Sequence, residues 1–547
     1  MTPFEISEQL TEDWADLSPI GATEYGIPGR DHLVDDFSPE GYAARADLYR
    51  EARDRLAPHL EQSDSRQART AKILLGWLES RIESHENGQW RRDLNHIYSP
   101  FQLLRDVFDV MPQERPEDWE NIIARLNGFP TALVGHRASL LVGIEVGDVV
   151  ARRQAESVLE QAEEVAAEDN RYVRYPAEAK RAGADPDRVA EAVLNARMAC
   201  EEFAAWLRHT YLPAARAQDA IGEESYNRGV ERFLGMQLDL EETYRWGWEE
   251  VHRLRDEMRV TAAAIEPHSS VDEVIEMLDT DPSRAAATRG EFVEFVSQIQ
   301  QTAVEQLDGD HFDVPEELKT VSVNMAPPGG ALGAWYHGPS EDFSRPGSIW
   351  YAPGERKLIP YWQEVSTAYH EGFPGHHLQV GTAIMQREKL SRFERAVVWY
   401  SGAGEGWALY AERLMDELGF FEKPEYRLGL LASQLFRATR VVVDIGCQLE
   451  KSIPAHAPLY SGEQWSYDRA VDYMNQVGLQ ARDVAESEVK RYLGWAAQAI
   501  SYKVGEREIL DIRRHLATSQ EFDRKDFHRR ILEAGAIRLD HLRQEMT

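Results

Sequence analysis

Cysteine is almost absent from this chain, since only Cys200 and Cys447 occur among its 547 residues. Two thiols cannot build a disulfide framework, and they supply too few ligands for a cysteine-rich structural zinc site. We therefore expect neither a disulfide framework nor a structural zinc site held by these thiols alone.

Basic residues are scarce relative to acidic ones. The chain has 61 Lys and Arg against 94 Asp and Glu, which gives a formal net charge of −33. Sequence-independent nucleic-acid binding needs a basic surface that displaces phosphate counterions, and docking on an anionic membrane needs the same sign of charge. We therefore expect neither a nucleic acid nor a membrane as a partner.

Long apolar runs are missing as well. We find no uninterrupted stretch of about 18 apolar residues, so we expect no transmembrane helix. The first residues, MTPFEISEQLTEDWADLSP, lack the basic start and apolar run of a secretory signal. With 43% hydrophobic and 28% charged residues, the composition is typical of a globular protein, and we expect a cytoplasmic one.

Helical periodicity dominates the residues that are present. Segments such as TAKILLGWLESRIESHENG place apolar residues three and four positions apart. Near Phe312 the chain becomes rich in Gly, Pro and aromatic residues, and TVSVNMA, GAWYHG and GSIWYAP have the pattern of short strands. We predict a mainly α fold with one small β-sheet. A helical region (1–311) would form much of the walls of a cleft, and a second region (312–547) would hold the sheet and the candidate site, the two together making one compact unit.

The segment YHEGFPGHHLQ, residues 369–379, begins like a metal-binding HExxH helix. In that motif, histidines at positions i and i+4 share one helix face and the glutamate acts as the general base. Here His370 and Glu371 are followed by Pro374 at the i+4 position, and a proline disrupts a helix.

A metal site is possible only if the helix, which we expect to start near Pro360, bulges at GFPG. Glycine and proline are the residue types that permit such a departure. Two looped-out residues would bring His376 beside His370, and three would bring His377. We favour His376 because it needs the smaller distortion, and His377 is then an alternative ligand or a neighbour of the ligands or the substrate.

A third ligand is offered by SGAGEGWALYAERLMDELG. Glu405 stands at the start of this predicted helix, and Glu412 lies about two turns further along the same face. Glu412 could orient a histidine or serve as an alternative ligand. The glycines beside Glu405 predict that this helix approaches the metal helix closely.

Several motifs together resemble the domain-of-unknown-function 885 (DUF885) family, a set of mostly bacterial proteins grouped with zinc peptidases. The matching pieces are HEGFPGHHLQ, EGWALYAERLMDELG, FRATRVVVDIG and QAISYKVGE. The strong part of the resemblance spans residues 327–510. More distantly, the layout is similar to the helical peptidases typified by angiotensin-converting enzyme, thimet oligopeptidase and carboxypeptidase Taq, whose HExxH motif is uninterrupted.

The resemblance implies a helical, zincin-like (gluzincin-like) fold with a deep cleft and a small sheet beside the metal helix. It implies one zinc ion held by His370, His376 and Glu405, with Glu371 as the general base. It also implies that Tyr502 donates a hydrogen bond to the developing oxyanion. The alternative for Tyr502 is a buried core tyrosine whose hydroxyl is satisfied within the fold.

Substrate contacts are predicted from residue types. Arg437 and Arg440 lie one helical turn apart and could hold a substrate carboxylate. Asp444, four residues after Arg440, favours a structural ion-pair network instead. Tyr336 and the strand around it could bind the backbone of an extended peptide, or they could simply pack under the sheet.

The sequence therefore predicts a zinc-dependent metallopeptidase that hydrolyses short peptides. A zinc hydrolase of non-peptide amides or esters is the first alternative, because water activated by zinc attacks any suitable carbonyl. The second is a binding protein of the same fold that holds no metal.

Overall fold

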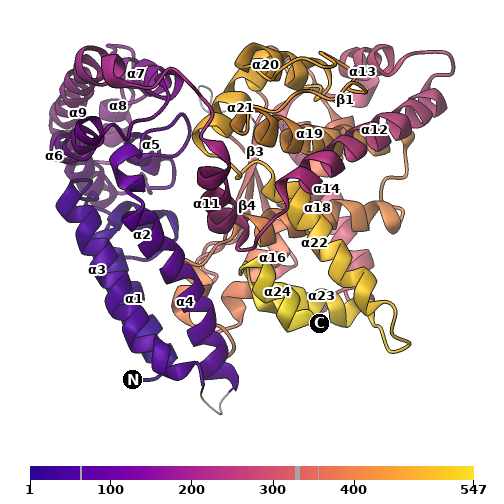
Figure 1. Cartoon of the computed structure of the whole chain (residues 1–547), viewed down its shortest axis with the longest axis horizontal. Coiled ribbons are helices and arrows are strands. Elements are labelled where there is room, and N and C mark those ends of the chain that lie inside the picture. The colour runs from indigo at the N-terminus through magenta and orange to yellow at the C-terminus, as the bar shows by residue number, and fades with distance from the viewer. Residues whose placement is uncertain (62–64, 327–332, 355) are drawn as a thin grey trace. The chain divides into compact units, whose positions relative to one another are not determined.

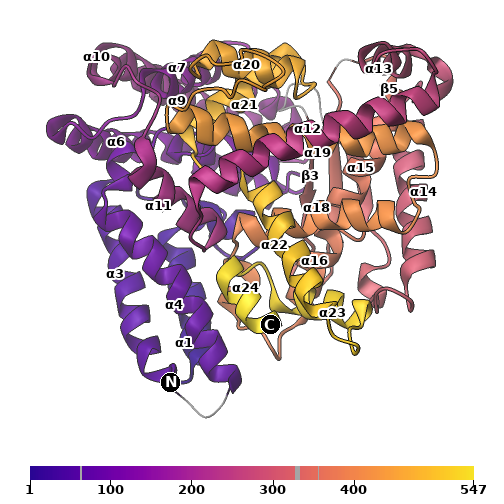
Figure 2. The same ribbon diagram turned by 45° about the vertical axis from the view of Figure 1, so that its right-hand side comes forward.

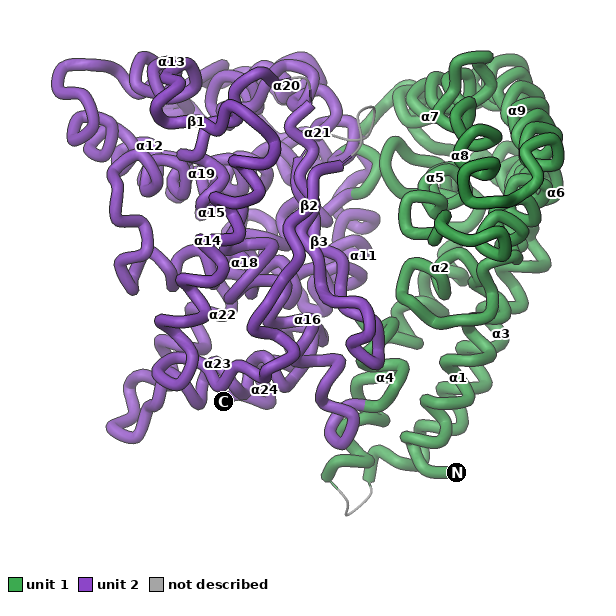
Figure 3. Tube along the Cα trace, turned by 180° about the vertical axis from the view of Figure 1, so that it is seen from behind, with its two compact units in different colours: residues 1–219, 391–398, 493–495 green, residues 220–390, 399–492, 496–547 purple. Residues whose placement is uncertain are grey.

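The computed structural model of the chain describes residues 1–61, 65–326, 333–354 and 356–547. Its elements are predominantly helical, which confirms the predicted mainly α fold (Figure 1). The chain forms two compact units (Figure 3): unit 1 comprises 1–219, 391–398 and 493–495, and unit 2 comprises 220–390, 399–492 and 496–547. The position between residues 311 and 312 lies inside unit 2.

Helices of unit 1 commonly begin at a proline that follows a capping residue. The side chains of Thr2, Ser38 and Asp185 accept hydrogen bonds from backbone N–H groups in the first turns of their helices. Helix α9 packs against α6, α7 and α8 around a buried, aromatic-rich core. The helices of unit 1 are α1 (Pro3–Leu17), α2 (Pro19–Glu24), α3 (Pro39–Leu56), α4 (Ser65–Glu86), α5 (Pro100–Asp106), α6 (Pro116–Val146), α7 (Arg152–Ala166), α8 (Tyr175–Arg181), α9 (Pro186–Trp206), α10 (Leu212–Ala214) and α17 (Arg392–Ala396).

Unit 2 contains every residue of the predicted site. Its helices α12 and α19 lie side by side, as do α18 and α22 (Figure 2). Helix α15 packs against both α18 and α19. The helices of this unit are α11 (Gly222–Leu234), α12 (Leu240–Ile265), α13 (Val271–Thr280), α14 (Arg289–Leu307), α15 (Tyr361–Glu371), α16 (His376–Met385), α18 (Ser401–Glu417), α19 (Pro424–Gln448), α20 (Tyr467–Gln476), α21 (Arg482–Gly494), α22 (Ser501–Leu516), α23 (Arg524–Ala534) and α24 (Leu539–Met546).

The three predicted strands form one small sheet. Strands β2 (Ser322–Met325), β4 (Ser348–Ala352) and β3 (Gly333–His337) lie in the order β2-β4-β3. Strand β4 is parallel to β2 and antiparallel to β3. The structure adds a second pairing, of β1 (Ala285–Ala286) with β5 (Ile359–Pro360), whose strands are too short to show a pattern in the sequence.

The sheet packs against α14 and α15 through one face. Side chains alternate along β4, so that Ile349 and Tyr351 are buried in a cluster with Phe292 of α14 and Ala368 of α15. Strand β3 also contacts α15. The small sheet therefore lies next to the predicted metal helix. Within the described part of the chain, no helix is both long and apolar enough to cross a membrane.

Candidate metal centre

The segment 369–379 forms the end of one helix and the start of another. Helix α15 begins after Pro360, as predicted, and ends at Glu371, whereas α16 begins at His376. The predicted departure from helix geometry is located at GFPG, but it is a full break between two helices and not a bulge within one. Across the break, the His377 N–H donates to the Gly372 carbonyl at 3.2 Å.

Two glycines and one glutamine shape this break. A Cβ atom on Gly375 would lie 2.0 Å from the carbonyl oxygen of His370, and one on Gly372 would lie 2.1 Å from Oε1 of Gln300. The Gln300 side chain donates to the Ala368 carbonyl at 2.7 Å and accepts from the Phe373 N–H at 2.6 Å. Gln300 therefore supplies an acceptor to the Phe373 N–H beyond the end of α15. It is a second donor to the Ala368 carbonyl, which already accepts from the Gly372 N–H at 2.9 Å.

The break brings His376 beside His370. The two imidazole rings lie 4.9 Å apart between centroids and are perpendicular, at 89°. Nε2 of His370 is 3.4 Å and Nε2 of His376 is 3.3 Å from Oε2 of Glu405. One donor atom from each residue lies within 4.8 Å of the others, so these three side chains form a group that can hold a metal ion.

The two histidine-to-glutamate distances fit a pair of zinc ligands. Two ligands about 2.0–2.1 Å from a tetrahedral zinc ion lie about 3.3–3.4 Å from each other, and two histidines with one glutamate are a ligand set of catalytic zinc. Nδ1 of His376 is buried and has no hydrogen-bond partner among the described residues. The other ring nitrogen of His376, Nε2, faces Glu405.

The electrostatics of the group also favour a cation at its centre. Burial by itself would raise the pKa of Glu405, but hydrogen bonds with His370 and His376 hold it well below its usual range. Burial would lower the pKa of His370, but its contacts with Glu405 and Glu412 raise it instead.

Glu371 directly follows His370 at the end of α15. It is half-buried, and the desolvation of its carboxyl raises its pKa above the ordinary value. Its place relative to His370 is that of the general base in the HExxH motif.

The glycines around Glu405 allow a close helix contact. That contact is with α22, whereas we predicted one with the metal helix, α15. A Cβ on Gly406 would lie 2.5 Å from the backbone of Gly505, and one on Gly505 would lie 1.9 Å from the Gly402 carbonyl. The glycines therefore let α18 cross α22 at backbone contact. The prediction of a glycine-mediated approach to the metal helix was wrong, because α15 meets α18 through larger side chains such as His370 and Glu412.

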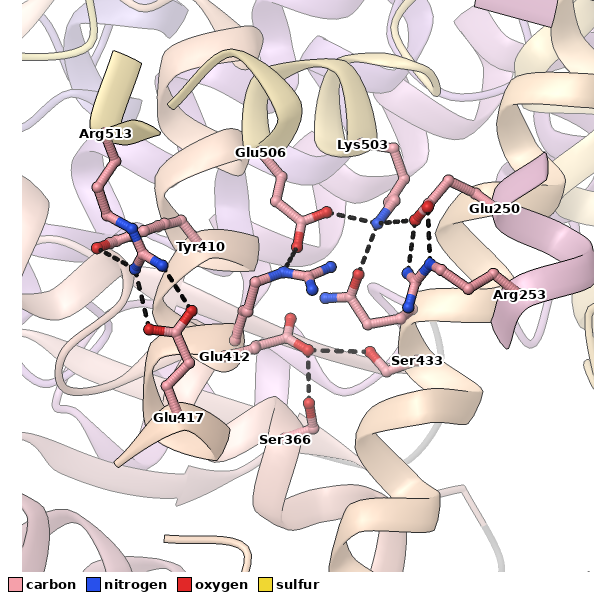
Figure 4. Close-up of polar contacts among 12 residues, drawn as sticks. Glu250, Arg253, Ser366, Tyr410, Glu412, Glu417, Ser433, Lys503, Glu506 and Arg513 are labelled. Carbon is pink, nitrogen blue, oxygen red and sulfur yellow. Dashed lines mark hydrogen bonds and ion pairs between the residues drawn. The ribbon is translucent and has the colours of Figure 1, made fainter. Parts of the chain in front are cut away.

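Glu412 orients His370. Its Oε1 lies 2.7 Å from Nδ1 of His370, and its Oε2 accepts hydrogen bonds from Ser366 at 2.5 Å and Ser433 at 3.3 Å (Figure 4). An acceptor at Nδ1 keeps the proton of a neutral imidazole on that nitrogen and leaves the lone pair of Nε2 facing Glu405. Of the two roles that the sequence left open for Glu412, its contacts match the orienting one.

His377 points away from the group of three. Its Nδ1 lies 3.0 Å from the Tyr336 hydroxyl, and its Nε2 lies 3.0 Å from the Leu318 carbonyl oxygen. Both ring nitrogens of His377 are therefore engaged by protein groups. The Tyr336 hydroxyl, which we predicted to contact substrate, has a protein partner as well.

Tyr502 of α22 lies against His370 with the two rings 6.4 Å apart and nearly parallel, at 18°. The guanidinium of Arg440 lies 4.6 Å from the Tyr502 ring centroid, and Nη2 of Arg491 lies 3.5 Å from the hydroxyl. An arginine can only donate to that oxygen, so the phenolic proton stays available to an acceptor.

The two predicted substrate arginines differ in their partners. Arg440 is buried and paired with Glu488, at 2.9 Å from Nη2 and 3.0 Å from Nε. Asp444, the partner suggested by spacing, instead accepts from the Tyr226 hydroxyl and the Ala497 N–H, each at 3.0 Å. Arg440 thus belongs to an ion-pair network, but with a different carboxylate from the predicted one. Arg437 has no ion pair with any described residue.

A network of buried ion pairs fixes the position of α22, the helix that carries Tyr502. The Lys503 ammonium, which is 1% exposed, contacts Glu506 at 2.5 Å, Gln434 at 2.8 Å and Glu250 at 3.2 Å (Figure 4). Arg413 of α18 also pairs with Glu506, at 2.8 Å. These contacts tie α12, α18, α19 and α22 together and so fix the position of α22 beside the group of three.

Comparison with known proteins places the chain in a family. A family model described as a bacterial protein of unknown function (DUF885) matches residues 19–546. The chain belongs to the DUF885 family. The resemblance seen in its motifs is thereby confirmed at the level of the family. Among curated proteins, none matches this DUF885 chain.

Two solved structures are similar to this DUF885 protein over its whole length. A candidate lipoprotein from Colwellia psychrerythraea is 21% identical with a TM-score of 0.85, over 100% of this chain and 98% of that one. A candidate lipoprotein of unknown function from Shewanella oneidensis is 18% identical with a TM-score of 0.71, over 100% and 99% of the two chains. At these identities the likeness shows a shared fold.

Several residues of this site were not predicted from the sequence. Ser366 lies one turn before His370, and that spacing within α15 is the signal that could have found it. Gln300, Ser433 and Arg491 come from other helices, and no local pattern links them to the motif.

Proposed function

We propose that this DUF885 protein is a zinc-dependent hydrolase that cleaves peptide bonds in short peptides. The observation that carries the proposal is the group formed by His370, His376 and Glu405. Its two histidine-to-glutamate distances match the separation of two ligands on a tetrahedral zinc ion. Glu371, the next residue after the first ligand, supplies the carboxylate that such chemistry needs.

The chain's own residues have distinct tasks in this reaction. A bound zinc ion would supply Lewis acidity, which lowers the pKa of a water molecule and polarises a peptide carbonyl. Glu371 accepts the proton of the attacking water and passes it to the leaving nitrogen. Tyr502 donates its phenolic proton in a hydrogen bond to the carbonyl oxygen as negative charge develops there. Glu412 holds His370 in the orientation that binding requires.

An extended peptide is the substrate class that the sheet favours. Strand β3 pairs with β4 on one side, and its other edge has no strand partner in the described ranges. Backbone N–H and C=O groups on such an edge pair with an extended chain. Because β3 contacts α15, a peptide aligned on it would run past the end of the helix that carries His370 and Glu371. The proposal includes a deep cleft of the zincin type, which would admit only short peptides to the site.

The test combines metal analysis with peptide hydrolysis. Purified protein loaded with zinc should hold one ion and cleave short peptides, and Glu371→Gln should keep the zinc but lose about 10²- to 10⁴-fold in kcat. Glu294→Gln, at an exposed position of α14, is the matched control and should retain full activity. Activity that survives Glu371→Gln would overturn the proposed mechanism.

Two other results would redirect the assignment. Turnover of small amides or esters without cleavage of any peptide would favour a non-peptide hydrolase. Negligible metal content after zinc addition would favour a binding protein. The cytoplasmic location stays a prediction, and the lipoprotein names of the two similar structures make cell fractionation its test.

A further inference from the structure

Arg437 differs from the other arginines of its helix. Helix α19 carries three, and Arg440 is paired with Glu488 while Arg427 is within 3.7 Å of Glu257 and 3.5 Å of Asp416. Arg437 is the one without a carboxylate partner in the part of the chain that the structure describes. Its Nη1 bonds to the hydroxyl and carbonyl oxygens of Ser433, and its Nε is buried with no partner.

This unpaired guanidinium is close to the candidate metal centre. Ser433 contacts both Arg437 and Glu412, and Glu412 contacts His370, so a short chain of polar contacts leads from the arginine to the first ligand. The positive charge of Arg437 also acts on the carboxyls of Glu412 and Glu371. The residue is half-buried in a helix whose other residues around it are mostly buried. An anion bound there would be partly removed from water and held near the reacting groups.

We infer that Arg437 binds the free C-terminal carboxylate of the substrate, so that the enzyme removes residues from the carboxyl end of a peptide. This inference rests on the proposed function and deepens it. A carboxylate matches the fork of a guanidinium in charge and geometry. Peptide substrates carry that group at their C-terminus, and its capture at Arg437 sets the scissile bond within a few residues of the chain end.

The charge of the site offers a competing role for Arg437. Glu371, Glu405 and Glu412 together carry three negative charges. One zinc ion would neutralise two of them, and Arg437 could serve only to neutralise the third. Under that role, loss of the arginine would slow all substrates equally. Under carboxylate binding, it would slow only substrates with a free C-terminus.

The experiment uses the zinc-loaded full-length protein and two sets of N-acetylated tetrapeptides with randomised side chains. One set ends in a free carboxylate and the other in a carboxamide. For the native protein, amidation should slow hydrolysis on the order of 100-fold. Arg437→Gln should abolish this preference by slowing the acids alone, whereas Arg427→Gln, the matched control, should preserve it. Mass spectrometry of the products counts the residues released.

Arg437→Lys keeps the charge and removes the fork. It should restore part of the preference for the acids, and zinc content reports whether each variant is folded. Equal hydrolysis of acids and amides by the native protein, or an equal loss on both in Arg437→Gln, would overturn carboxylate binding while leaving the Glu371-dependent hydrolase intact. Absence of zinc-dependent hydrolysis of either set would overturn the proposed function and this inference with it.

Discussion

The role of Glu412 can be tested by one substitution, Glu412→Gln. Glu412 is fully buried, and its two oxygens contact three groups, namely Nδ1 of His370 and the hydroxyls of Ser366 and Ser433. A glutamine of the same shape still offers one acceptor oxygen to His370, and the serine hydroxyls can rotate to accept from its amide nitrogen. The substitution therefore removes mainly the negative charge that supports the imidazole.

Partners that orient a metal-binding histidine typically contribute 10- to 100-fold to metal affinity. The expected loss of zinc affinity in Glu412→Gln is therefore about 1.4–2.7 kcal/mol, taking about 1.36 kcal/mol for each factor of ten. Competition against a chromophoric zinc chelator at fixed pH measures it. Glu417→Gln, on the same helix but paired with Arg513, is the control and should bind zinc as the native protein does (Figure 4). Affinity unchanged in Glu412→Gln, or reduced equally in the control, would refute this reasoning.

Three further predictions follow from the same structure. His376→Gln should lose bound zinc while His377→Gln keeps it, because His376 turns a ring nitrogen towards Glu405 and His377 does not. Metal analysis after dialysis measures this, and the reverse result would make His377 the ligand. Gly406→Ala should destabilise unit 2 by about 1–3 kcal/mol in chemical denaturation, because its Cβ would meet the backbone of α22 at 2.5 Å. Gly290→Ala, where the nearest atom is 4.0 Å away, should not. Burial lowers the pKa of His136 from 6.5 to about 4. As the pH falls, His136 therefore binds a proton in the unfolded chain before it does so in the folded one. About 3 kcal/mol of the free energy of unfolding should be lost between pH 6.5 and pH 4. Denaturation midpoints across this range should change less steeply in His136→Gln, and an unchanged slope would contradict the assignment.

Much of the fold was accessible from the sequence because its patterns are local. Apolar spacing predicted the helices, and three short aromatic segments predicted β2, β3 and β4. The start of α15 after Pro360 followed from the fixed φ angle of proline. The pairing of β1 with β5 left no such signal, because each strand has two residues and its partner is distant in the chain.

The site was less accessible, because its decisive contacts join distant segments. Spacing alone left His376 and His377 as alternatives, and the direction of each ring depends on Leu318, Tyr336 and Glu405, which lie on other elements. The ion pair of Arg440 was assigned to the neighbouring turn, but Glu488 on α21 forms it. Local spacing cannot distinguish an arginine that is neutralised by another helix from one that remains unpaired.

The break between α15 and α16 makes the geometry of the two histidines depend on tertiary structure. In an uninterrupted helix, the backbone hydrogen bonds between successive turns hold both ligands. Here Gln300 and Trp407, whose indole N–H donates to the Pro374 carbonyl at 2.9 Å, brace the junction from outside. A zinc ion would therefore act as a crosslink between α15, α16 and α18. Its binding energy would contribute to the stability of the fold as well as to chemistry, and its removal would loosen this junction before the rest of the unit.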